Sequence, residues 1–369
     1  MQKREFRKPN FSIDRTRRGD LAKQIAFGLR TAIETGYYRP GDILPPVRDL
    51  AEILGVSMGI AVQAVNKIRE AGLISPRPAV GSVVCAPDRP LWKGQVLIVS
   101  PSGGTQHYIN SVCAALCDAL VANGYLALTV NVPRTAEGKF DFAMLDLMMR
   151  QQVDLVVQLH DKPEIAKWLS SHKVPFARLT ADAPKRLPAG CVGVVRRSNE
   201  AADVSFAAHC REAGIKNIVV ATAWDSCSVM SSLRKAGIGA KRWHFDIPHG
   251  TAGSKVSQRA FDVVSERLVK SKGSRPKLIF FDDDFLASGA LAAMLHAGMR
   301  IPEDIRFATL FNCSGGGSGI AFAVPVTRME VDSHADGRVM ADAVLSYLKK
   351  GVFPAGVTVG PKYVRGETF

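Results

Sequence analysis

The chain has 369 residues, of which 48 are Lys or Arg and 34 are Asp or Glu, giving a formal net charge of +14, and 47% are hydrophobic. This length exceeds a typical domain of roughly 100–200 residues, so we expect two or three compact units. The hydrophobic fraction is large enough to fill real cores, which excludes disorder of the whole chain. The positive charge indicates a polyanionic partner, nucleic acid or an acidic membrane surface, or only a well-solvated surface.

The positive charge is concentrated at the N-terminus. The first 95 residues contain 16 Lys or Arg and nine Asp or Glu, so about a quarter of the chain carries half of the net charge. Residues 1–18 alone contain seven basic and two acidic residues, with almost no apolar periodicity. We therefore expect residues 1–18 to form a flexible basic arm. The alternative is a tail that only increases solubility.

Cysteine spacing and apolar runs indicate where the protein works. The seven cysteines are odd in number and never spaced C-x-x-C, so neither a zinc site nor a disulfide framework is expected, and a reducing cytosol fits. No stretch approaches the roughly 18 uninterrupted apolar residues of a membrane span, and the basic start has no apolar segment after it. We expect a soluble, cytoplasmic protein with no membrane partner.

Residues 19–86 have the pattern of a winged helix-turn-helix domain. Apolar residues at three- and four-residue steps predict one helix up to Thr35, a second from Pro46 to Gly55 and a third that Ser57 can cap. Two apolar runs, residues 73–75 and 81–84, predict a two-stranded ribbon, as in a wing. In a helix-turn-helix the second helix of the pair enters the major groove.

The residues that join these elements are specific. The segment Gly36-Tyr-Tyr-Arg-Pro-Gly-Asp-Ile-Leu-Pro-Pro-Val-Arg-Asp-Leu-Ala-Glu-Ile-Leu-Gly-Val-Ser57, with Ala71-Gly-Leu-Ile74 and Gly81-Ser82, resembles the GntR-type winged helix-turn-helix. The resemblance implies that the partner is double-stranded operator DNA. Arg48 would then meet a phosphate or a guanine edge, and Gly81 would let the wing approach the minor groove. The alternative for Arg48 is a surface ion pair with Asp49 or Glu52.

The expected recognition helix departs from the family. Its usual Ser-Arg-Thr-Thr-Val-Arg is replaced by Ser57-Met-Gly-Ile-Ala-Val62, so bidentate arginine contacts with guanine are lost. We expect contacts with A·T-rich DNA through thymine methyl groups and Gln63 or Asn66, with affinity coming mostly from backbone contacts and the basic arm. The alternatives are weak or degenerate DNA binding, or a surface that binds another protein. The residues expected at the DNA are Arg48, Ser57, Met58, Gly59, Val62, Gln63, Asn66, Lys67, Arg77 and Gly81.

Residues 87–94 contain Pro87 and Pro90 and no periodicity, and after them short apolar runs alternate with helical stretches from 95 to 369. We expect residues 87–94 to form a short, fairly stiff linker. The alternation predicts the α/β fold class, with doubly wound parallel sheets, and its length predicts two lobes facing a cleft. The expected strands are 95–100, 125–131, 154–158, 174–178, 192–195, 217–222, 243–245, 277–281, 305–311 and 324–329. Helices are expected to end near 123, 150, 171, 213, 236, 270, 297 and 349.

Four segments of this body resemble the effector domain of LacI/GalR-type regulators, which is like a periplasmic sugar-binding protein. They are Phe280-Phe-Asp-Asp-Asp-Phe-Leu-Ala-Ser-Gly-Ala-Leu291, Gly298-Met-Arg-Ile-Pro-Glu-Asp-Ile305, Val324-Pro-Val-Thr-Arg-Met-Glu-Val-Asp332 and Pro361-Lys-Tyr-Val-Arg-Gly-Glu-Thr368. A GntR-type head on such a body is the arrangement of arabinose-repressor-like regulators. The resemblance implies a homodimer and a small-molecule effector, a sugar or polyol, with no cofactor.

The resemblance assigns ligand contacts to Asp284, in D-x-x-A-x-G-A, and to Arg234. A carboxylate and a guanidinium together suit a polyol. Trp224 follows a strand and can stack on a sugar face, and His107 and Tyr108 follow the first strand. The alternatives are ordinary packing for Trp224 and Tyr108, and a helix N-cap for Asp284.

Several departures from the family concern the ligand. The family's Asn-Pro-Phe after the first strand is replaced by Ser102-Gly-Gly-Thr-Gln-His-Tyr108, and its Gly-Phe/Tyr-Asp by Leu310-Phe-Asn312. The run Gly315-Gly-Gly-Ser-Gly319 is unusual. The ligand is then not a common sugar, or the cleft has lost its ligand.

The sequence contains no motif that predicts an enzyme. There is no phosphate loop and no H-E-x-x-H, and the segment around Ser318 departs from G-x-S-x-G. GntR-type heads also occur on aminotransferase-like bodies with a pyridoxal lysine, but the strand-helix alternation argues against that here. We expect a ligand-modulated transcriptional repressor with no catalytic or metal-binding residue. The alternative is a ligand-independent DNA-binding protein with a vestigial cleft.

Overall fold

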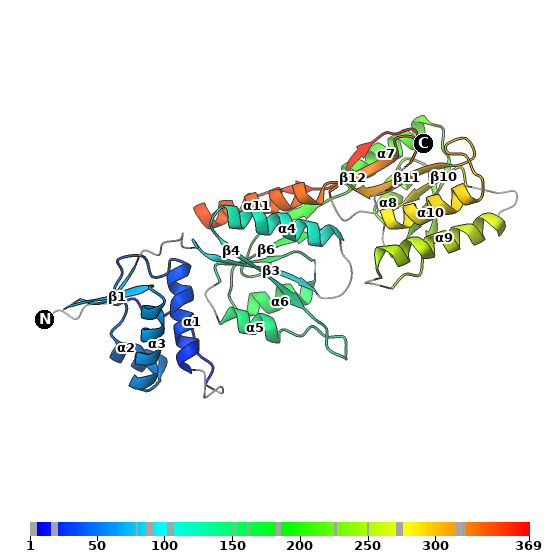
Figure 1. The fold of residues 1–369 in the computed structure, drawn as a ribbon. Coiled ribbons are helices and arrows are strands. Elements are labelled where there is room, and N and C mark those ends of the chain that lie inside the picture. Colours follow the sequence, from blue (N-terminus) through cyan, green and yellow to red (C-terminus); the bar gives the residue numbers. More distant parts are fainter. Residues whose placement is uncertain are drawn as a thin grey trace.

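The computed structural model describes residues 6–15, 21–78, 80–85, 92–101, 107–150, 153–160, 162–181, 186–224, 227–248, 251–270, 276–314, 320 and 322–369. It shows a small N-terminal head followed by two α/β lobes (Figure 1). The two ends of the predicted arm, most of the predicted linker and the glycine-rich run 315–319 lie outside the described residues.

In its described residues, the head consists of three helices and a two-stranded antiparallel ribbon, as the sequence predicts. Its elements are α1 (Leu21–Glu34), α2 (Val47–Leu54), α3 (Met58–Glu70), β1 (Ile74–Arg77) and β2 (Gly81–Val84). Gly55 has a φ of 62° and ends α2, because a residue with no side chain adopts this left-handed turn without strain. The Ser57 hydroxyl then accepts a hydrogen bond from the backbone N–H of Ile60 and caps α3.

The described part of the predicted arm is not free. Phe11 and Ile13 pack against the apolar core of the head. The ring of Phe11 covers Gly28 of α1, where an added Cβ would lie 2.4 Å from Phe11 Cδ2. Gln24 forms two hydrogen bonds with the backbone of Asp14, and Arg15 donates to the carbonyl of Leu54. The prediction of a flexible arm is therefore wrong for residues 6–15, because two apolar side chains anchor them to the head.

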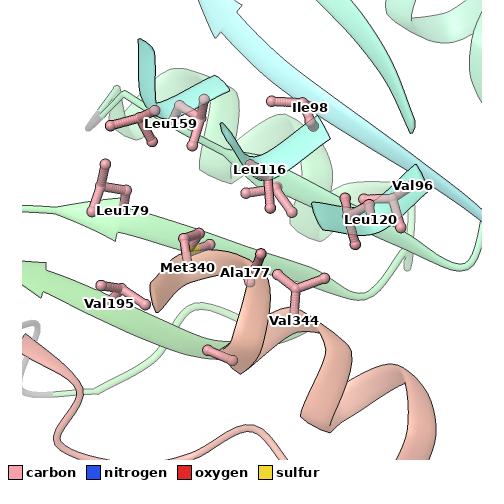
Figure 2. Packing of buried hydrophobic residues seen from close by; sticks show 14 of the residues in the cluster. Val96, Ile98, Leu116, Leu120, Leu159, Ala177, Leu179, Val195, Met340 and Val344 are labelled. Atoms are coloured by element: carbon pink, nitrogen blue, oxygen red, sulfur yellow. The ribbon is translucent and has the colours of Figure 1, made fainter. Parts of the chain in front are cut away.

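Lobe 1, residues 95–197 with 333–359, is built around a parallel sheet of order β13-β7-β6-β5-β3-β4. Helices α4 and α11 lie side by side on one face of this sheet, and α5 and α6 cover the other (Figure 1). Figure 2 shows Leu116 and Leu120 of α4 and Met340 and Val344 of α11 facing the sheet. The elements are β3 (Gln95–Pro101), α4 (His107–Ala122), β4 (Leu126–Val132), α5 (Ala143–Met149), β5 (Leu155–Gln158), α6 (Pro163–Ser171), β6 (Phe176–Thr180), β7 (Cys191–Arg197), α11 (Ser333–Lys350) and β13 (Thr358–Val359).

Lobe 2, residues 200–331 with 362–369, has the strand order β14-β12-β11-β10-β8-β9. Apolar residues of α7 and α8 pack on one face of the sheet and those of α9 and α10 on the other. The elements are α7 (Glu200–Glu212), β8 (Asn217–Thr222), α8 (Val229–Lys235), β9 (Gly239–His244), α9 (Gly253–Lys270), β10 (Leu278–Phe281), α10 (Asp284–His296), β11 (Arg306–Asn312), β12 (Thr327–Val331) and β14 (Lys362–Val364).

The two-lobed α/β fold confirms the predicted fold class, with two differences. The C-terminal strands β13 and β14 were not predicted, because two- and three-residue strands are too short to show a period. Strand β14 runs antiparallel to β12, so lobe 2 is not wholly parallel. The described chain passes between the lobes after β7, after β12 and after β13, which makes these three segments the connection between the two lobes.

Candidate DNA-binding surface and ligand cavity

Helix α3 presents one face to solvent and the other to the core of the head. Met58 is 51% exposed and Val62 is 40% exposed, whereas Ala61, Ala64 and Val65 are buried. A Cβ added to Gly59 would meet no atom within 4 Å, so packing does not require glycine there. The other residues predicted to contact DNA from this helix are exposed or partly exposed: Ser57, Gln63, Asn66 and Lys67. The open face of α3 is therefore mainly uncharged.

The predicted cationic contacts lie on the elements that flank α3. Arg48, in the first turn of α2, and Arg77, at the end of β1, are both exposed. Gly81 begins β2 with a φ of 118°, a conformation that L-residues rarely adopt. The ion pair described within the head joins Arg30 and Glu34 and does not involve Arg48. These positions suit contacts with DNA phosphates beside an uncharged helix face.

A cavity of about 740 Å³ lies between the lobes. Four of the five predicted ligand residues line it: His107 and Tyr108 from lobe 1, and Trp224 and Asp284 from lobe 2. The fifth, Arg234, does not line the cavity and is exposed in the last turn of α8. The preceding Leu233 is fully buried, and a neighbouring position on a helix points about 100° away, so the Arg234 side chain faces solvent. The predicted contact of Arg234 with a ligand in the cavity is therefore wrong.

Tyr108 is held in the lobe 1 wall. Its hydroxyl donates a 2.9 Å hydrogen bond to Oδ2 of Asp336 on α11, and the Arg197 guanidinium lies 4.4 Å from its ring centroid. Burial raises the pKa of Tyr108, against the opposing charge of Arg197. Burial also raises the pKa of Asp336, which the hydrogen bond from Tyr108 partly offsets. The ring of Tyr108 is therefore a fixed wall of the cavity.

The three consecutive aspartates that follow β10, residues 282–284, have different roles. Asp283 caps α10, because its Oδ1 accepts hydrogen bonds from the N–H groups of Phe285 and Leu286. The alternative interpretation of Asp284 as the N-cap is therefore wrong. Asp284 is 6% exposed and lines the cavity. Burial raises the pKa of Asp283 to about 6 and that of Asp282 to about 7.

Further polar residues that were not predicted as ligand contacts line the cavity. Four of them are Arg197, Asp203, Asp282 and Asn312. Each has one buried polar atom with no hydrogen-bond partner among the described residues: Arg197 Nε, Asp203 Oδ1, Asp282 Oδ1 and Asn312 Nδ2. Buried polar atoms are normally paired, so unpaired ones that converge on one cavity indicate a ligand-binding site. The sequence contained a signal for Asp203, because a charged residue stands there on the apolar face of a predicted helix.

Among the described residues, no group of three or more His, Cys, Asp or Glu side chains is arranged to hold a metal ion. Within the same residues, no helix combines the length and hydropathy that crossing a bilayer requires.

The sequence profiles of two families match this chain. That of the bacterial regulatory proteins of the gntR family matches residues 21–84, and that of periplasmic binding protein-like domains matches residues 205–369. The chain joins a gntR-family helix-turn-helix domain to a periplasmic binding protein-like domain. Both parts of the predicted resemblance are thereby confirmed.

The gntR-family domain has a curated relative in Mycobacterium tuberculosis, an uncharacterized HTH-type transcriptional regulator. The two are 42% identical over 66 residues, which cover 18% of this chain and 27% of the relative. The chain thus matches about a quarter of the length of this relative.

The periplasmic binding protein-like body is similar to solved structures of LacI-family regulators. One from Bifidobacterium animalis has a TM-score of 0.58 at 17% identity, over 74% of this chain and 97% of that chain. One from Arthrobacter, in complex with lactose, has a TM-score of 0.57 at 17% identity, over 74% and 98%. The lac repressor dimer bound to operator and the anti-inducer ONPF has a TM-score of 0.55 at 17% identity, over 74% and 93%. This similarity establishes the fold, and the matched proteins are regulators, not enzymes, as predicted.

Proposed function

We propose that this protein is a transcriptional repressor whose binding to operator DNA is modulated by a small molecule held between the two lobes. The observation that carries the proposal is one chain with an exposed, capped α3 in a gntR-family head and a polar-lined cavity of about 740 Å³ between the lobes of its body. Such a protein would act in the cytoplasm, where bacterial DNA is found.

The DNA contact is proposed to run through the exposed face of α3. Lys67 is the one basic residue among those predicted to contact DNA from this helix, so base choice would come from Gln63, Asn66 and the apolar side chains. Arg48 and Arg77 would supply phosphate contacts, which give affinity without sequence choice. Selection of binding sites from random-sequence duplex DNA tests this, with A·T-rich half-sites as the expected product. Selection of G·C-rich sites, unchanged in Gln63→Ala, would contradict it.

The ligand is proposed to be a sugar-like polyol. A carboxylate from Asp284, a guanidinium from Arg197 and the indole of Trp224 meet in one cavity, and these groups together suit hydroxyls and an apolar ring face. The solved Arthrobacter regulator of this fold is described in complex with lactose. A thermal-shift screen of the full chain against sugars and polyols tests the proposal.

The alternative is a DNA-binding protein with a vestigial cavity. The four buried polar atoms without partners among the described residues favour a cavity that binds a ligand. In a vestigial cavity these atoms would destabilise the fold by their desolvation free energy, and no ligand would offset that cost. A screen in which no sugar or polyol changes the Tm, combined with normal DNA binding, would favour the vestigial cleft.

The proposed mechanism is a population shift in a homodimer on a roughly palindromic operator. The lac repressor, which shares the fold, is described as a dimer bound to operator. A ligand that contacts both lobes would favour one arrangement of the lobes. The three segments that connect the lobes would pass this rearrangement on to the dimer interface and to the heads. Linkage requires that operator DNA change ligand affinity by the same factor as ligand changes DNA affinity. Equal ligand affinities with and without operator would exclude the mechanism, and light scattering of the purified protein tests the dimer.

A further inference from the structure

Two buried carboxylates lie around Cys227 in the lobe 2 wall of the cavity. Asp203 lies on α7 and is 2% exposed, and Asp282 follows β10. Both residues line the cavity, and the negative charge of each raises the pKa of the Cys227 thiol. The Oδ1 atoms of both residues lack a hydrogen-bond partner in the described part of the molecule. Asp203 and Asp282 are called the acidic pair below.

The remaining contacts of the acidic pair come from neutral groups. The neutral side chain of Ser228 lowers the pKa of Asp203, and those of Thr222 and Cys227 lower the pKa of Asp282, against the larger effect of burial. None of these neutral groups supplies a positive charge. The Oδ1 atom of each residue is buried and has no hydrogen-bond partner among the described residues, and both residues line the cavity.

No described basic side chain compensates the acidic pair. The groups that act on the pKa of Asp203 and Asp282 include the carboxylates of Glu200 and Asp283 but no cation. The Arg197 guanidinium, on the opposite wall, lies over Tyr108 and acts on Asp336 instead. The other basic side chain in the cavity lining, Lys162, also belongs to lobe 1, and His107 acts on Asp283. The acidic pair therefore has no cation among the groups that act on it.

The kind of ligand that fits follows from this charge. A neutral sugar hydroxyl donates one hydrogen bond to a carboxylate and leaves its charge in place. A protonated primary amine donates three hydrogen bonds and neutralises charge, and charge-assisted bonds are the stronger ones. The Trp224 indole, 43% exposed on the same cavity, offers a ring face that attracts cations. A carboxylate pair beside an indole face suits an organic cation, and no group of three or more His, Cys, Asp or Glu among the described residues could hold a metal ion.

We propose that the interlobe cavity binds an amine-bearing polyol, such as an amino sugar, with its ammonium group between Asp203 and Asp282. The inference rests on the proposed function, because it assumes that the cavity holds a ligand. Asn312 Nδ2 and Arg197 Nε, which also line the cavity and lack partners among the described residues, are donors for the oxygen atoms of the same ligand.

The experiment compares amines with their neutral counterparts on the full chain in an amine-free phosphate buffer at neutral pH. The probes are D-glucosamine, D-galactosamine, D-mannosamine and ethanolamine, each paired with D-glucose, D-galactose, D-mannose or ethylene glycol. Thermal shift identifies binders and calorimetry measures their Kd. We expect at least one amine to bind about tenfold or more tightly than its neutral counterpart, since a charge-assisted contact contributes that much.

Two variants test the placement of the ammonium group. Asp203→Asn and Asp282→Asn keep the side-chain shape and remove the charge, so each is expected to abolish the preference for amines. Asp342→Asn, on the exposed face of α11 and outside the cavity, is the matched control and should keep the preference.

Three results would overturn the inference: no amine raises the Tm, neutral probes bind as tightly as amines, or the preference for amines survives in both Asn variants. A neutral sugar that raises the Tm and changes DNA affinity would overturn this inference and leave the proposed function standing. DNA binding with no response to any probe would count against both the inference and ligand modulation.

Discussion

The hydroxyl of Tyr108 donates a 2.9 Å hydrogen bond to the Asp336 carboxylate across 228 residues of sequence. This contact joins α4 to α11, the helix by which the chain returns from lobe 2 to lobe 1. It fixes one wall of the cavity to the connection between the lobes, and the Arg197 guanidinium over the Tyr108 ring completes the cluster.

The first prediction concerns this contact. Tyr108→Phe removes the hydroxyl that stabilises a buried carboxylate, so the free energy of unfolding should fall by about 1–3 kcal/mol. Denaturant unfolding of the ligand-free protein measures the change. Tyr347→Phe, on the same α11 and with no hydrogen bond from its hydroxyl to the described residues, is the control and should change stability little. Equal effects of both changes would show that the Tyr108–Asp336 bond adds no stability.

The second prediction concerns pH. Burial raises the pKa of Asp282 from 3.8 to about 7 in the folded protein. Below the lower value the carboxyl is protonated in both states and has no effect on stability; between the two values only the unfolded chain loses its proton, so this group lowers stability as pH rises. Asp282→Asn should therefore raise the Tm of ligand-free protein above pH 7, and the gain should shrink toward pH 4. A gain that is the same at both ends of the range would contradict the raised pKa.

The third prediction concerns the packing of Phe11 on α1. Gly28→Ala places a methyl group 2.4 Å from a Phe11 ring carbon, so the ring must move and the head should lose stability despite the higher helix propensity of alanine. Gly59→Ala is the matched change in α3, where no atom lies within 4 Å of the new Cβ, and it should stabilise the head by up to about 1 kcal/mol. Thermal unfolding of both variants measures the difference. Equal stabilisation by both would mean that residues 6–15 do not pack on α1 in solution.

The fourth prediction separates affinity from sequence choice in DNA binding. Arg77→Gln removes a phosphate contact, so it should weaken binding to all sequences and reduce the slope of log K against log salt by about 1. Gln63→Ala should leave the slope unchanged and alter the preferred sequence. Fluorescence anisotropy across a salt series measures both, with Arg300→Gln, on the exposed surface of lobe 2, as the control. A change in sequence preference with Arg77→Gln alone would reverse the proposed roles.

The sequence by itself determined the elements and the fold class. The apolar steps of α3, its Ser57 cap and the turn at Gly55 are local features, and the structure has the helix where they predict it. The alternation of strands and helices predicted two parallel-sheet lobes for the same reason, since period and capping depend on neighbouring residues. Strands β13 and β14 were not predicted, because they are too short for a period to show.

The tertiary structure alone decided which side chains meet. Asp203, Asp282 and Asn312 lie far apart in the sequence and come together because α7 packs on the lobe 2 sheet, in which β10 and β11 are neighbours. Arg197, at the end of β7, lines the same cavity from lobe 1. The orientation of α8 turned Arg234 away from the cavity, although its motif had assigned it a ligand contact. The packing of Phe11 against Gly28 could not be predicted either, because the surrounding segment is rich in basic residues and shows no apolar period. Side-chain direction and long-range contact depend on how elements pack together, and periodicity within one element carries no record of that packing.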